Sequence, residues 1–184
     1  MRKFISAALR PFSTRPSGFI TEEVRRSGRL NLSGGKIRSD EEVQKIVEEL
    51  THNKGIVKSL EVGGDNLGPK AAKHFADFLT TDKDLESIYF DQNNLGDEGA
   101  KELARALEKN KTLRNLDLSK NNIGKNGGKA IAQMLAVNKG LESLHLGGNK
   151  KLLSNDFFFF NGFATELADA IEENTSLKIL RFNP

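Results

Sequence analysis

The apolar residues of this chain recur with a fixed period from about residue 27 onward. One phrase, with leucine-like residues at its first, fourth and sixth positions, begins four times at intervals of 28 residues. Its four copies open at Val57, Leu85, Leu113 and Leu141. A weaker copy precedes them around Leu30, and the start of another follows at Leu177. A period of this length indicates one small structural unit that is repeated along the chain.

Each repeat has two parts with different hydrophobic periods. In the first part apolar and polar residues alternate, as in Leu116-Asp-Leu118, which predicts a short strand. The second part, such as residues 97–107, has apolar residues at helical spacing and acidic residues in its first turn. The predicted helices end near residues of types that tolerate a left-handed stop, namely Asn53, Asp82, Asn110, Asn138 and Asn174. The pattern therefore predicts an α/β solenoid, with parallel strands on one face and helices on the other.

The phrase itself resembles a known signature. Residues 85–95 and 113–123 follow the pattern Leu-x-x-Leu-x-Leu-x-x-Asn-x-Leu, with Ile, Phe or Leu at the apolar positions, and this resembles the leucine-rich repeat. The 28-residue length and the string Asn-Leu-Gly-Asp-Glu-Gly-Ala at residues 94–100 resemble the ribonuclease-inhibitor type of that repeat. The resemblance implies a right-handed α/β solenoid of about five repeats within a domain spanning residues 21–184.

The resemblance also implies a structural role for the asparagine of each phrase. In the family this asparagine turns inward and hydrogen-bonds the backbone of the adjacent coils, which forms an asparagine ladder. The ladder positions in this chain are Asn93, Asn121 and Asn149. Gly35 and Asp65 occupy the corresponding positions near the N-terminal end and depart from the pattern.

Strand side chains that lie between the buried leucines face away from the helices, and the repeat places them in columns. One column contains Tyr89, Asp117 and His145, and the next contains Asp91. We expect a polar face with an acidic centre and one aromatic side chain. Such a face suits a basic peptide or a loop of another protein. The alternative is a polar face that only contacts solvent.

One interval breaks the period. Leu141 and Leu177 are 36 residues apart, and the eight extra residues lie within an insertion at about residues 150–163. The insertion includes four consecutive phenylalanines, Phe157, Phe158, Phe159 and Phe160. Together with Leu152, Leu153 and Phe163 they exceed the apolar side chains that we expect one terminal coil to bury, which predicts contact with a protein partner or with a membrane surface. Alternatively, the insertion folds over the end of the solenoid as a cap.

The first twenty residues have a composition of their own. They contain Arg2, Lys3, Arg10 and Arg15 and no acidic residue, and their apolar side chains fall on one side of a helix. This composition is typical of a mitochondrial import presequence that is separate from the solenoid. The run of residues 10–13 resembles the matrix processing site, which predicts cleavage after Phe12. A plastid transit peptide and a basic tail without a targeting role are the alternatives.

Charge and composition exclude several functions. The net charge is +3, but residues 1–12 carry three basic side chains and no acid, so the remainder has equal numbers of basic and acidic residues. A neutral domain argues against direct nucleic-acid binding, which needs clustered excess Lys and Arg. No apolar run reaches the roughly 18 residues of a membrane-spanning helix. The chain has no Cys, so it has no disulfide and no thiolate nucleophile.

No motif predicts catalysis or a cofactor. Residues 124–129 are rich in Gly and Lys but lack the spacing of a phosphate-binding loop. The histidines His52, His74 and His145 lie in different repeats without metal-ligand spacing, so we expect no metal. We also expect the fold to bring together no Ser–His–Asp set other than by accident.

We therefore expect a non-enzymatic protein-interaction module. The presequence-like start favours an accessory subunit or assembly factor of a larger mitochondrial complex, in the matrix or on the matrix side of the inner membrane. The alternative is a regulatory binder of one soluble partner, similar to ribonuclease inhibitor or to the Ran GTPase-activating protein.

Overall fold

The computed structural model describes residues 18–152 and 162–182. Within these residues, six strands alternate with helices. The strands are β1 (Arg29–Asn31), β2 (Ser59–Glu61), β3 (Ser87–Tyr89), β4 (Asn115–Asp117), β5 (Ser143–His145) and β6 (Ile179–Arg181). The helices are α1 (Glu22–Ser27), α2 (Asp40–His52), α3 (Pro69–Thr81), α4 (Gly96–Leu107), α5 (Lys125–Val137) and α6 (Gly162–Glu173). The weak first copy of the phrase and the last one both form strands.

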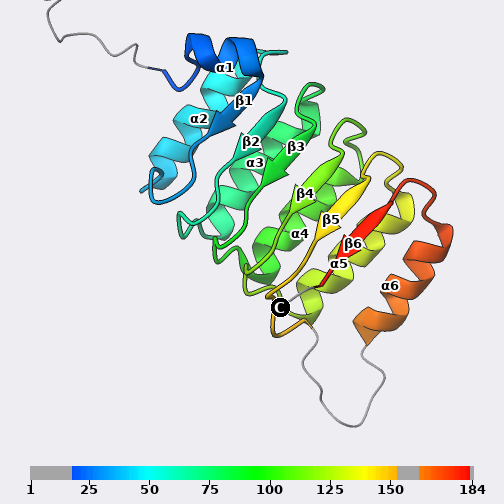
Figure 1. Cartoon of the computed structure of the whole chain (residues 1–184). Coiled ribbons are helices and arrows are strands. Elements are labelled where there is room, and N and C mark those ends of the chain that lie inside the picture. The colour runs from blue at the N-terminus through cyan, green and yellow to red at the C-terminus, as the bar shows by residue number, and fades with distance from the viewer. Residues whose placement is uncertain (1–17, 153–161, 183–184) are drawn as a thin grey trace, which may run out of the picture.

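The strands form one parallel sheet in the order of the chain. Equivalent positions of successive repeats lie side by side, so that Ile88 pairs with Leu60 on one side and with Leu116 on the other. Helices α2 to α6 all lie on one side of this sheet, behind it in Figure 1. The structure confirms the α/β solenoid predicted from the 28-residue period.

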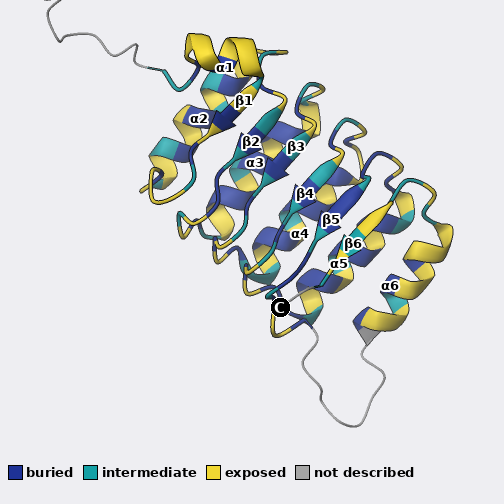
Figure 2. Cartoon of the chain, in the orientation of Figure 1, coloured by how far each residue is buried: buried dark blue, intermediate teal, exposed yellow. Residues whose placement is uncertain are grey.

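The core lies between the sheet and the helices. Strand side chains such as Leu116 and Leu144 are 2% and 0% exposed, and they meet helix side chains such as Leu107 and Ile131 in one continuous cluster. Figure 2 shows the buried residues on the inner sides of the helices, with exposed residues on their outer sides. One strand and one helix cannot enclose such a layer alone, so each repeat is stabilised by its neighbours.

The asparagines of the phrase join successive repeats through side-chain hydrogen bonds. Asn121 Oδ1 accepts from the backbone N–H groups of Asn93 and Leu95 at 3.1 and 3.3 Å. Asn121 Nδ2 donates to Phe90 O at 2.8 Å. Asn149 makes the same contacts one repeat further on. The ladder supplies partners to backbone groups that the turns would otherwise leave unpaired inside the protein.

Asp65 occupies the ladder position near the N-terminal end. Its Oδ1 accepts from Ile37 N at 3.1 Å, as an asparagine oxygen would. Its Oδ2 is buried and has no hydrogen-bond partner among the described residues. An ionised carboxylate has no proton to donate, so Asp65 performs only half of the role that Asn121 performs.

Three residues that end helices do not have the left-handed backbone conformation that their residue types tolerate. The φ angles of Asn53, Asp82 and Asn138 are −111°, −70° and −73°, so none of them is left-handed. The expectation of left-handed stops is therefore wrong at these three positions. The side chains of Asp82 and Asn138 instead accept hydrogen bonds from the backbone of the turn that leads to the next strand, whereas Asn53 Nδ2 donates back to Glu49 O of its own helix.

Asp82, Asn110, Asn138 and Asn174 form a second ladder, at the N-terminal ends of the strands. Asn138 Oδ1 accepts from Gly140 N and Leu141 N at 2.9 and 2.7 Å. Asn138 Nδ2 donates to Leu107 O and Asn110 O, in the preceding repeat, at 2.6 and 2.9 Å. Equivalent bonds are made by Asn110 and Asn174, and the accepting half by Asp82. Each repeat is thus tied to the preceding one at both ends of its strand.

The packed domain starts earlier than residue 21. Ile20 is 8% exposed and belongs to the core cluster. The Glu49 carboxylate on α2 accepts from the backbone N–H groups of Phe19 and Ile20 at 2.7 and 2.8 Å. Residues 19 and 20, which the sequence grouped with the leader, are therefore part of the solenoid. Residues 1–17, including the expected processing site, lie outside the described part.

Candidate functional site

The side of the sheet opposite the helices carries a column of polar side chains, which we call the strand face. The register places Tyr89 between Glu61 and Asp117, and it places His145 on the other side of Asp117. The complete column is Asn31, Glu61, Tyr89, Asp117, His145 and Arg181. The repeat thus brings together side chains that are about 28 residues apart in sequence.

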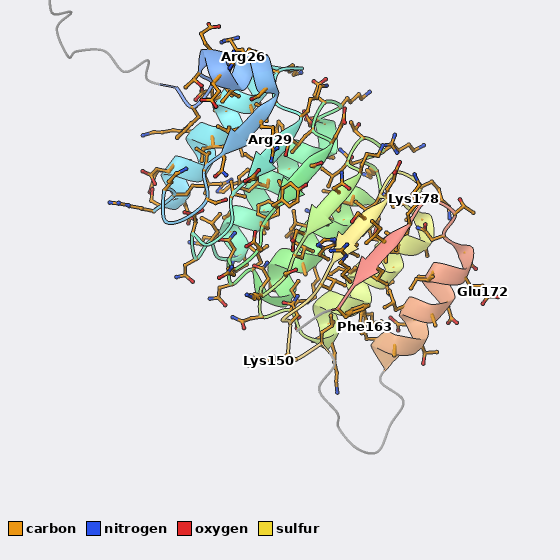
Figure 3. The ribbon with its side chains drawn as sticks, viewed as in Figure 1. Arg26, Arg29, Lys150, Phe163, Glu172 and Lys178 are labelled. Carbon is orange, nitrogen blue, oxygen red and sulfur yellow. The ribbon has the colours of Figure 1, made fainter. Side chains whose placement is uncertain are left out.

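At the N-terminal end of the strand face, the negative charge of Glu61 is balanced by a basic residue of the same face. Glu61 forms an ion pair with Arg29, with Nη2 and Oε1 2.9 Å apart, and it accepts a hydrogen bond from Asn31. Figure 3 labels Arg29 on β1, at this end of the sheet. Because Glu61 has these partners, it contributes little negative potential to the face.

The centre of the face is acidic. Asp117 Oδ1 accepts from Ser119 N at 2.8 Å, and its Oδ2 lies 3.5 Å from His145 Nδ1. The two side chains are 20% and 28% exposed, so both reach solvent. Within the described residues, no Lys or Arg forms an ion pair with Asp117.

Asp91 adds a second carboxylate beside the column. A Cβ atom on Gly63 would lie 2.4 Å from Asp91 Oδ1, so the glycine provides the space that this carboxylate occupies. Asp91 Oδ2 accepts a hydrogen bond from Gln92 at 3.3 Å. Tyr89 is half-buried between Glu61 and Asp117, and its hydroxyl makes no hydrogen bond to any residue the structure describes. Two carboxylates and an aromatic ring therefore share the centre of the strand face.

Among the described residues, the structure brings together a Ser–His–Asp set of the accidental kind that the sequence analysis allowed. Ser143 Oγ lies 3.4 Å from His145 Nε2, and His145 Nδ1 faces Asp117. However, the N–H of a nucleophilic serine serves as an oxyanion donor in such sites, and here it donates to Arg114 O at 2.9 Å. Ser143 is also 8% exposed. We assign these contacts to the polar lining of the face and not to catalysis.

The insertion is described only at its two ends. Phe157, Phe158, Phe159 and Phe160 lie outside the described residues. Leu152 and Phe163 are 0% and 3% exposed, and both lie against Gly128 of α5. These two residues belong to the core, and the expectation that the whole insertion has more apolar side chains than one coil buries stays a prediction.

Other site types find no support in the described part of the chain. No group of three or more His, Cys, Asp or Glu side chains gathers there around a position for a metal ion. Among the same residues, no helix is both long and apolar enough to cross a membrane. Sequence reasoning missed Arg29 and Ser143 as parts of the face.

Two repeats match the leucine-rich repeat family, at residues 82–104 and 109–132, which contain β3, β4, most of α4 and the start of α5. The chain therefore contains leucine-rich repeats. Leiomodin-1 actin-binding site 2 has a similar structure, with a TM-score of 0.63 and 21% identity over 83% of this chain and 86% of that chain. The tropomodulin C-terminal domain of Caenorhabditis elegans also has a TM-score of 0.63, with 16% identity over 79% and 84% of the two chains. No curated protein matches this chain in sequence.

Because both sequence identities are below 25%, the similarity to these two solved structures shows a shared fold. Leucine-rich repeats stack into solenoids that present an extended binding surface, and they generally serve as binding modules without enzymatic activity. The chain has the architecture of a protein-interaction module.

Proposed function

We propose that the strand face binds a basic segment of a protein partner, and that the chain is an accessory subunit or assembly factor of a larger mitochondrial complex. The observation that carries the first part is the acidic centre at Asp91 and Asp117, where neither carboxylate has a Lys or Arg partner within residues 18–152 and 162–182. A bound Lys or Arg would pair with these carboxylates and lie against the ring of Tyr89. The leader-like composition of residues 1–20 supports the second part.

The strand-face proposal is tested by removing its charge without changing its shape. In the double variant Asp91→Asn/Asp117→Asn, the carboxylates become isosteric amides. The matched control is Glu48→Gln/Asp77→Asn, which removes two charges from exposed positions on α2 and α3. Native gels of gently solubilised source cells should show the wild-type chain and the control in a large assembly. The face variant should migrate as a small species.

Retention of the face variant in the large assembly would show that the partner binds elsewhere. Circular dichroism of the purified variants checks that both pairs of substitutions leave the fold intact.

The mitochondrial assignment needs a separate experiment. Residues 1–25 fused to a fluorescent protein should direct it to mitochondria, and a fusion with Arg2, Lys3 and Arg10 changed to Gln should stay in the cytosol. A cytosolic signal from the unaltered fusion would overturn the localisation. It would leave the strand-face proposal in place.

A second candidate is a regulatory binder of one soluble partner. Its support is the similar solved structure that is named as an actin-binding site. Migration of the native protein as a small pair, instead of a large assembly, would favour this candidate. Co-sedimentation of the purified chain with filamentous actin tests the most direct version of it.

A further inference from the structure

A second row of side chains runs beside the strand-face column, and we call it the flanking row. It begins with Arg29 on β1, and its members on the next four strands are small and polar. These are Ser59, Ser87, Asn115 and Ser143. The long basic side chain at the start of the flanking row shows how this face holds a guanidinium.

Arg29 binds the acid of the neighbouring strand. In the register Arg29 lies beside Ser59, and Glu61 is two residues further along β2. Arg29 Nη2 donates to Glu61 Oε1 at 2.9 Å, and the other oxygen of Glu61 accepts from Asn31. A guanidinium that starts in the flanking row therefore reaches a carboxylate of the column on the next strand.

The same relation recurs two strands further on, without the guanidinium. Ser87 on β3 pairs with Asn115, and Asp117 is two residues further along β4. Because the repeats stack in register, Ser87 takes the place of Arg29, and Asp117 takes the place of Glu61. The other steps of this kind end on residues that are not acidic, namely Tyr89, His145 and Arg181. Asp117 is therefore the acid of the column that lacks an arginine in the flanking row.

The groups around this position suit a guanidinium. Asp117 is 20% exposed, and a carboxylate that already accepts from Ser119 N has capacity for further donors. Asn115 Nδ2 donates to Ser87 Oγ at 2.9 Å, and Asn115 Oδ1 accepts no hydrogen bond from any residue that the structure describes. Tyr89 adds an aromatic ring beside Asp117. A guanidinium has five donors in a planar fork and stacks on aromatic rings, so these three groups favour arginine over lysine.

We propose that Asp117, Asn115 and Tyr89 form a subsite for one arginine side chain of the partner, which lies over Ser87. This inference rests on the proposed binding of a basic segment by the strand face, and it names the residue that the segment contributes. The partner's guanidinium takes the place that Arg29 holds at β1 and β2. It donates to the carboxylate of Asp117 and to the amide oxygen of Asn115.

Two short peptides test the subsite on the full 184-residue chain. They are N-acetyl-Gly-Arg-Gly-amide and the same peptide with Lys in place of Arg, each titrated into ¹⁵N-labelled protein while NMR records the backbone amides. We expect saturable shifts at Ser87, Tyr89 and Asp117, with the arginine peptide at least about threefold tighter than the lysine peptide. Equal affinities would overturn the preference for arginine, and no saturable shift from either peptide would overturn the subsite.

Ser87→Arg supplies the missing guanidinium from within the chain. The introduced side chain should occupy the subsite, so that the arginine peptide no longer shifts Tyr89 and Asp117. The matched control is Glu86→Gln, which changes the net charge by the same amount at the adjacent exposed residue and should leave the shifts in place. Unchanged peptide binding by Ser87→Arg would overturn the placement, and the amide spectrum itself shows whether each variant is folded.

Arg29→Ser makes the opposite change at an exposed position. It frees Glu61 from its ion pair and should create a second arginine site, seen as new saturable shifts at Ser59 and Glu61. The shifts at Tyr89 and Asp117 should remain. A variant in which no second site appears would show that the Arg29 pair is not a guide to where arginine binds this face.

These outcomes are separate from those of the strand-face proposal. If Asp91→Asn/Asp117→Asn releases the chain from the large assembly but the two peptides bind equally, the strand-face proposal stands and the arginine subsite is wrong. If the arginine peptide binds as expected but the assembly retains the face variant, the subsite stands and the assembly uses another surface.

Discussion

At the scale of single residues, the fold depends on side-chain amides that both donate and accept. Asn121 and Asn138 each bind backbone groups of two repeats, and both are at most 2% exposed. Only an amide offers two donor hydrogens and a carbonyl oxygen in a short side chain. The position of Asp65 shows the consequence of replacing the amide, because one of its oxygens is buried without a partner.

Replacement of Asp65 by Asn should therefore stabilise the protein. The new amide group can donate to nearby backbone carbonyls in place of the unpartnered oxygen. We expect a gain of about 0.5–1.5 kcal/mol in the free energy of unfolding, measured by urea titration. Asp91→Asn, which alters an accessible carboxylate, is the control and should change stability by less than about 0.5 kcal/mol. A loss of stability in Asp65→Asn would mean that the buried oxygen has a favourable partner after all.

The second ladder makes its own prediction. Asn138→Ala removes partners from four backbone groups in a site that is 2% exposed. We expect it to cost at least about 1–3 kcal/mol, the cost of leaving one such group unpaired. Asn126→Ala changes an exposed asparagine on α5 and should cost less than about 0.5 kcal/mol. Equal melting temperatures for the two variants would show that the second ladder contributes nothing to stability.

At the scale of elements, close packing between successive helices sets the spacing of the repeats. Glycines on one helix leave space for the alanine side chains of the preceding helix, as Gly99 does for Ala72. The absence of a side chain at these positions has a cost, because glycine is unfavourable inside a helix by roughly 0.5–1 kcal/mol relative to alanine. Packing outweighs that cost wherever the helices meet.

Gly99→Ala separates these two effects. The added Cβ would lie 2.9 Å from Leu95 Cβ and 3.0 Å from Ala72 Cβ, so the backbones have to move apart. Overpacking costs about 1–3 kcal/mol, which exceeds the gain in helix propensity. We expect net destabilisation by about 0.5–2 kcal/mol in urea titration. A more stable variant would show that α3 and α4 have room for a methyl group.

At the scale of the whole molecule, each repeat is stabilised by its contacts with the repeats on either side. Leu116 pairs with Ile88 on one side and with Leu144 on the other, so it joins the two halves of the solenoid. A change at this position affects the coupling between repeats as well as the packing of one of them.

We therefore expect Leu116→Ala to cost about 2–5 kcal/mol and to lower the slope of the urea transition, because the two halves then unfold less cooperatively. Val137→Ala, at an exposed position, should leave both the midpoint and the slope unchanged within about 0.5 kcal/mol. A lower midpoint with an unchanged slope would mean that the solenoid still unfolds as a single unit.

The sequence determined the parts of the protein that repeat. The 28-residue period predicted the alternating strands and helices, the buried leucines and the columns of the strand face, because each property follows from the geometry inside one repeat. It therefore also predicted that Tyr89, Asp117 and His145 would lie in one row.

Only the tertiary structure decided what happens where the repeat is interrupted or ends. The burial of Leu152 and Phe163 and the covering of the first repeat by residues 18–27 depend on which surfaces meet in space. The geometry of Ser143 with His145 and the non-left-handed backbone of Asn138 depend on contacts to neighbouring repeats. A hydrophobic period records which face of an element is buried, but it contains no information about what covers that face at the ends of the solenoid.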